Sequence, residues 1–123
     1  MNWKFTGDRP VYQQIMAAIR GAILKGELPP GGKVPSVRDL AAQAQVNPNT
    51  MQRAFQELER EGLVFSQRSS GRFVTEDVEI ILEAKKAMAR QYVESFMKSM
   101  EQLGYTGEEI LRLLEEGEKA EKQ

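Results

Sequence analysis

Residues 36–62 read SVRDLAAQAQVNPNTMQRAFQELEREG, and this stretch decides the fold. Its apolar positions recur at helical spacing in two runs that are interrupted at residues 45–46. Ser36 and Asn47 stand directly before the two runs, and both residue types favour helix N-caps. Pro48 suits the first helical position, where a missing N–H costs nothing. The stretch therefore predicts two consecutive helices joined by a short turn.

The residues before this stretch predict a third helix and an N-terminal arm. Asp8 is placed near its N-cap and Pro10 in its first turn, and Gly26 follows its last residue. Trp3 and Phe5 alternate with polar residues, which is compatible with either a short strand or an arm packed on the body.

The residues after the stretch predict a β-hairpin. Residues 63–67 and 72–75 are β-prone and flank a polar loop at residues 68–71. Val34, in the stiff proline-rich turn before the second helix, is a candidate for a single bridge to this hairpin. The resulting order of elements is that of a winged helix-turn-helix, with three helices and a β-hairpin wing. The predicted class is mainly α (α+β), and residues 1–75 form the predicted DNA-binding domain.

Residues 76–123 predict a separate helical region. A long helix runs from Asp77 to about Leu103, and Thr106 with Glu109 forms a capping box for a last helix. The tail after Gly117 is expected to fray because it is strongly charged.

The apolar stripe of these two helices is too long for them to bury alone, so a twofold-related copy is expected to cover it. The residues predicted to serve dimerisation are Ile81, Met88, Tyr92, Phe96, Met100, Leu103, Ile110, Leu113 and Leu114.

Composition argues against most enzymes. The chain has no cysteine, which excludes disulfides and thiol chemistry, and no histidine, which removes the commonest general base and the commonest transition-metal ligand. Acidic pairs in the last helix have no accompanying polar cleft and are interpreted as solvated. We therefore predict no catalytic residue, no metal and no cofactor. No apolar run reaches about 18 residues and no export signal opens the chain, which predicts a cytoplasmic protein.

Charge divides the chain at about residue 75. Residues 1–75 hold ten Lys/Arg and six Asp/Glu, whereas residues 76–123 hold seven and twelve. The net charges are +4 and −5, so the overall charge of −1 is a property of the tail. The basic part is suited to phosphates, and the acidic part to water and another protein chain.

The second helix of a helix-turn-helix enters the major groove of DNA with its N-terminal end first. Here that helix starts at Pro48, and it carries outward polar side chains that suit base edges. These predicted readers are Asn49, Thr50, Gln52, Arg53 and Gln56. Taken alone, such residues are more often ordinary polar surface residues, but the flanking helix and hairpin favour DNA contact.

Two further groups are predicted to meet phosphates. Ser36 and Arg38 open the second helix, whose N-terminal N–H groups and dipole favour anions, and Lys33 precedes them. Arg68 and Arg72 flank the hairpin loop, where Gly71 permits a close backbone approach, although a solvated hairpin remains the alternative for Arg68.

The predicted partners are an operator in double-stranded DNA and a second copy of the chain. The alternative is a winged-helix module that binds only proteins, because fold alone does not fix function. A small-molecule effector is left open and without an identity.

Five segments resemble the GntR family of bacterial regulators. They are Pro10–Ile15, Leu28–Ala41, Val46–Ala54, Leu58–Leu63 and Ser70–Val74, and the resemblance covers about residues 9–75. The short helical tail is similar to the YtrA-type branch, whose C-terminal region mainly dimerises.

The resemblance implies a repressor that binds a pseudo-palindromic operator. By position, it assigns DNA contacts to Arg38, Thr50 and Gly71. The family pattern has arginine where this chain has Pro48 and Gln52, so Asn49, Gln52 and Arg53 remain as the readers.

Overall fold

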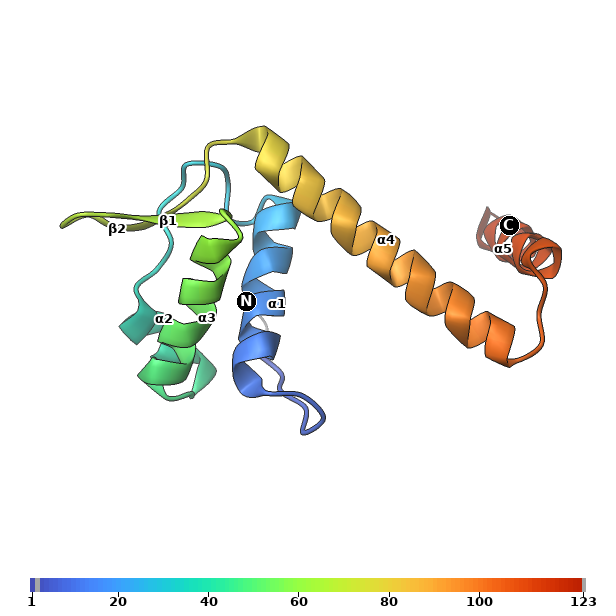
Figure 1. Ribbon diagram of the computed structural model, residues 1–123, viewed down its shortest axis with the longest axis horizontal. Helices are drawn as coiled ribbons and strands as arrows, with labels where there is room; N and C mark the ends of the chain where they lie inside the picture. The colour runs from blue at the N-terminus through green and yellow to red at the C-terminus, as the bar shows by residue number, and fades with distance from the viewer. Residues whose placement is uncertain (2, 123) are drawn as a thin grey trace. The chain divides into compact units, whose positions relative to one another are not determined.

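The computed structural model describes residue 1 and residues 3–122. Its elements are, in order, α1 (Val11–Lys25), α2 (Val37–Ala44), α3 (Pro48–Arg60), β1 (Val64–Gln67), β2 (Gly71–Val74), α4 (Val78–Gln102) and α5 (Gly107–Lys122). The chain divides into two compact units, Met1–Lys85 and the part from Lys86 onward, so the division falls within α4 (Figure 1). The mainly helical class with a β-hairpin is confirmed.

The helix-turn-helix forms from local capping signals. The Ser36 hydroxyl oxygen accepts a hydrogen bond from the N–H of Asp39 at 3.1 Å, which starts α2. Asn47 Oδ1 accepts one from the N–H of Asn49 at 2.8 Å, and Pro48 is the first residue of α3. Gln45 lies between the helices in the left-handed region, with φ of 57°. Both predicted N-caps are confirmed.

Replacing Asn47 with alanine should lower the free energy of unfolding by about 1 kcal/mol, because a first-turn N–H of α3 loses its acceptor. Urea denaturation followed by circular dichroism measures the loss. Asn49→Ala is the matched control, since the Asn49 side chain makes no cap bond. Equal losses in the two variants would show that the cap contributes nothing.

The N-terminal segment departs from the prediction. Pro10 is the N-cap of α1 and makes no side-chain cap bond, so the predicted cap near Asp8 is wrong. The Asp8 carboxylate instead accepts a hydrogen bond from the Thr6 hydroxyl. The buried amide of Gln14 ties the segment down, because Oε1 accepts from the N–H of Thr6 and Nε2 donates to two backbone carbonyls.

Trp3 and Phe5 form an arm and not a strand. Both rings pack against the core cluster, with ring centroids 6.2 Å apart. At the other end of α1, Gly26 adopts φ of 84° and closes the helix as predicted.

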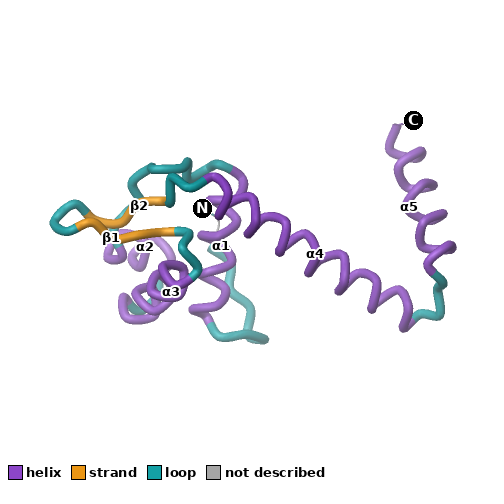
Figure 2. The backbone as a smooth tube through the Cα atoms, turned by 45° about the horizontal axis from the view of Figure 1, so that its top comes forward, coloured by secondary structure: helices purple, strands orange, loops and turns teal. Residues whose placement is uncertain are grey.

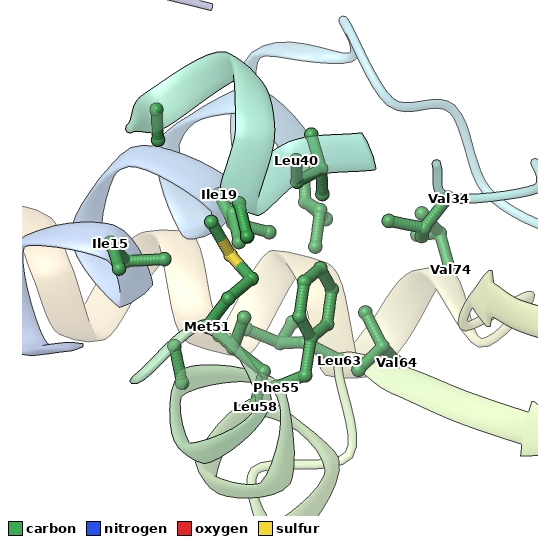
Figure 3. Packing of buried hydrophobic residues seen from close by; sticks show 14 residues of the cluster. Ile15, Ile19, Val34, Leu40, Met51, Phe55, Leu58, Leu63, Val64 and Val74 are labelled. Atoms are coloured by element: carbon green, nitrogen blue, oxygen red, sulfur yellow. The ribbon is translucent and has the colours of Figure 1, made fainter. Parts of the chain in front are cut away.

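The core of the first unit lies between α1 and α3. Met51, Phe55 and Leu58 of α3 are fully buried and pack with Ile15 and Ile19 of α1 (Figure 3). This packing leaves the opposite face of α3 free for a ligand.

The wing is a two-stranded antiparallel hairpin with Val64 paired to Val74. A single bridge joins it to the turn before α2, at Lys33 and Phe73 and thus one residue from the predicted position. The N–H of Val34 donates to the carbonyl of Arg72 at 2.9 Å. In Figures 1 and 2 the hairpin tip extends beyond α1–α3, so the loop is open to a partner.

The second unit contains most of α4 and all of α5. The capping box is confirmed, since the N–H of Thr106 donates to Glu109 Oε1 at 3.0 Å and the N–H of Glu109 donates to Thr106 Oγ1 at 3.3 Å. Gly104, with φ of 90°, closes α4. The prediction of a frayed tail after Gly117 is wrong, because α5 continues to Lys122. Within residues 1 and 3–122, no helix is long and apolar enough to cross a membrane.

Candidate nucleic-acid interface

The helix predicted to read DNA, α3, has one buried and one open face. Met51, Ala54, Phe55 and Leu58 occupy the buried face. Of the predicted readers, Asn49, Arg53 and Gln56 are exposed, whereas Thr50 and Gln52 are half-buried. The open face therefore offers amide and guanidinium groups at the N-terminal half of the helix.

A cleft of about 510 Å³ lies between the start of α2, α3 and the wing loop. It brings together six of the residues predicted to bind DNA, namely Lys33, Ser36, Arg38, Gln52, Gly71 and Arg72. Ser69 and Ser70 of the wing loop also line it, and the sequence analysis missed them. The other predicted residues lie outside its lining, and they are Asn49, Thr50, Arg53, Gln56 and Arg68.

Three cations in or near the cleft form no ion pair with a carboxylate of the described residues. Lys33, Arg38 and Arg68 are exposed, and no ion pair holds any of them within the part of the chain that the structure describes. Gly71, with φ of 102°, needs the conformational freedom of glycine beside the Lys33 stem. The cleft therefore presents positive charge and exposed backbone to an anionic ligand.

Arg72 behaves differently from these cations. Its Nε lies 2.6 Å from Glu59 Oε1, and its guanidinium carbon lies 5.2 Å from the centre of the Phe55 ring. The Ser66 hydroxyl donates to the same carboxylate oxygen at 2.7 Å. Partial burial raises the pKa of Glu59, but the hydrogen bonds and the charge of Arg72 outweigh it and lower the pKa below its usual range. Glu59 is therefore ionised at neutral pH and forms an ion pair with Arg72.

Arg53 is held from the other side of α3. Its guanidinium carbon lies 3.8 Å from the centre of the Tyr12 ring, which belongs to α1. Such stacking restricts the side chain while leaving its N–H groups available.

The sequence analysis missed Glu59 and Tyr12. The spacing offered one signal, because Glu59 follows Gln52 by seven residues and so lies on the same side of α3, facing the wing. Nothing local indicated Tyr12, whose contact with Arg53 exists only after α1 and α3 pack.

The predicted dimerisation residues fall into three sets. Tyr92, Phe96, Ile110 and Leu114 line an apolar groove of about 600 Å³ between α4 and α5. Met88 and Met100 are half-buried, whereas Leu103 and Leu113 are exposed, and none of these four lines the groove. Ile81 packs against the core of the first unit, so it already has apolar neighbours in its own chain.

The fold and the basic cleft define a winged helix-turn-helix domain of the DNA-binding class. Residues 11–74 match the family described as "Bacterial regulatory proteins, gntR family". The chain therefore belongs to the GntR family of transcriptional regulators, which are DNA-binding proteins and not enzymes.

Two relatives from Bacillus subtilis (strain 168) span nearly the whole chain. One is named "Uncharacterized HTH-type transcriptional regulator YhcF" and is 44% identical over 90% of this chain and 92% of its own. The other, the repressor YtrA, is 36% identical over 86% of this chain and 80% of its own. The short tail is thus shared with YtrA-type regulators.

Solved structures agree with the fold. A GntR family transcriptional regulator from Listeria monocytogenes superposes with a TM-score of 0.86 at 36% identity, covering 91% of this chain and 98% of that one. The DNA-binding domain of AraR, solved in complex with operator ORX1, gives a TM-score of 0.57 at 29% identity. That match covers 61% of this chain and 96% of AraR's domain.

Proposed function

We propose that the protein is a cytoplasmic transcriptional repressor that binds a pseudo-palindromic operator as a homodimer. One observation carries the DNA-binding part: the cleft between α2, α3 and the wing gathers unpaired cations beside the open face of α3. The name of one relative supports repression, since YtrA is a repressor. The AraR domain, which is related in fold, binds operator DNA.

Each part of the surface has a distinct task in this proposal. Lys33, Arg38 and Arg68 contact phosphates, and the first N–H groups of α2 near Ser36 add dipolar attraction. Gly71 lets the wing loop approach the backbone of the DNA.

The readers of base edges lie at the N-terminal half of α3. Asn49, Gln52 and Arg53 contact base edges, with Thr50 and Gln56 beside them.

The second unit supports dimerisation by its own surface. Tyr92 and Leu111 are 67% and 61% exposed although they line an almost entirely apolar groove. Leaving these side chains in water is unfavourable by about 25 cal/mol for each Å² that a partner could cover. A second copy of the same two helices presents the same apolar surface, and a twofold axis lets each cover the other. The homodimer in turn matches an inverted repeat.

Selection of bound duplexes from a random-sequence pool tests the proposal. The wild-type protein should enrich an inverted repeat whose half-sites lie about one helical turn apart. If the selection enriches no sequence and the protein binds a partner protein instead, the result would favour the alternative of a winged-helix module that binds only proteins.

A further inference from the structure

Arg72 is a wing cation that contacts α3, the helix predicted to read DNA, and these contacts hold its side chain against the protein. Its side chain is 19% exposed, and its Nε donates to Glu59 Oε1 over 2.6 Å. The face of the Phe55 ring lies under the guanidinium. Contacts on two sides therefore fix both the position and the plane of this group.

The other acidic residue of α3, Glu57, forms an ordinary surface ion pair and serves as a comparison for Glu59. Glu57 is paired with Arg60 one turn further along the same helix, and the Arg60 side chain is 76% exposed. That pair joins neighbours on one helix, and such pairs contribute little. Glu59 instead joins α3 to β2, and its carboxylate is also bonded by Ser66 of β1.

The fixed guanidinium also meets a predicted reader of bases. Arg72 Nη1 lies 3.5 Å from Gln52 Oε1, a long hydrogen bond that orients the amide. Among the described residues, none accepts a hydrogen bond from Gln52 Nε2. The NH₂ end of the amide is thus the end left for a ligand. In the major groove, guanine offers two adjacent acceptors, N7 and O6.

We propose that Glu59 is a positioning residue that holds Arg72 against Gln52 and away from the phosphates. Gln52 then presents its NH₂ donors to the base edge and favours guanine at one position of each half-site. This inference rests on the proposed operator binding. It assigns to the wing a role in sequence reading through α3, in addition to any phosphate contact of its loop.

Glu59→Gln is the informative variant, and Glu57→Gln is its matched control because both remove one negative charge from α3. The probes are the duplex that the wild type selects, its variants at each base pair, and a random-sequence duplex. In Glu59→Gln the released Arg72 reaches a phosphate, so random-duplex binding strengthens. The slope of log affinity against log salt steepens by about 2 for the dimer.

In Glu59→Gln, base preference should change only at the base pair that Gln52 contacts. The preference for guanine at the Gln52 position should fall about fivefold or more in Glu59→Gln, while the other positions keep theirs. Glu57→Gln should leave both the slope and the preference unchanged. Adding Arg72→Ala to Glu59→Gln should remove the extra salt dependence, because the released cation is then absent.

The outcomes separate this inference from the proposed function. If the wild type selects a sequence but Glu59→Gln behaves as Glu57→Gln does, the positioning role is overturned and operator binding stands. If the wild type selects nothing, both fall together. Thermal unfolding by circular dichroism accompanies each variant. A loss of binding shared equally by all base-pair variants would mark a merely structural role and would also overturn the inference.

Discussion

Replacing Phe96 with glutamate is expected to convert the proposed homodimer into monomers and to weaken operator binding at least about 100-fold. Phe96 lines the apolar groove between α4 and α5, and a carboxylate there would lose its water when a second copy docks. A monomer engages one half-site and forfeits the gain of linked binding, which is about 10²–10⁴. Sedimentation velocity measures the mass, and fluorescence anisotropy measures the affinity.

Gln91→Glu is the matched control for this prediction. It adds the same charge to α4 five residues earlier, on the side of the helix away from the groove. We expect it to remain dimeric and to bind normally. A dimeric Phe96→Glu protein with retained helicity would place the interface elsewhere.

Replacing Arg38 with alanine should weaken operator binding by roughly 10- to 100-fold for each half-site. Arg38 lines the cleft, is exposed and has no carboxylate partner among the described residues, so its full charge is available to DNA. Because the proposed contact of Arg38 is to phosphate, the salt slope should also become shallower by about 1 per protomer.

Arg112→Ala serves as the comparison, because it removes the same charge from α5, outside the cleft. Anisotropy titrations of the two variants on one selected duplex give the contrast. If Arg38→Ala and the wild type bind with equal affinity, the start of α2 does not contact the DNA.

Features encoded by neighbouring residues could be predicted from the sequence. Ser36 and Asn47 cap α2 and α3 through bonds to N–H groups only two or three residues ahead. Thr106 and Glu109 are likewise close in sequence. Helical spacing separated the core face of α3 from its open face, and the order of the elements predicted the winged helix-turn-helix.

Features that depend on tertiary packing could not be predicted in this way. The Arg72–Glu59 pair crosses from the wing to α3, and the Arg53–Tyr12 stack crosses from α3 to α1. Charge counting treats Arg72 as a free cation, whereas in the structure it is paired with Glu59. Asp8 failed as a cap for a different, local reason: its carboxylate accepts a hydrogen bond from Thr6, and Gln14 holds the backbone of Thr6 before α1 begins.

The salt dependence of binding to the selected duplex tests the central claim most directly. In the proposed complex, Lys33, Arg38 and Arg68 of two protomers make six phosphate contacts, so log affinity should fall with log salt with a slope of about −5. The same titration on a random duplex should show weaker binding at every salt concentration. A flat response, or equal affinity for the two duplexes, would contradict the account of an operator-binding cleft.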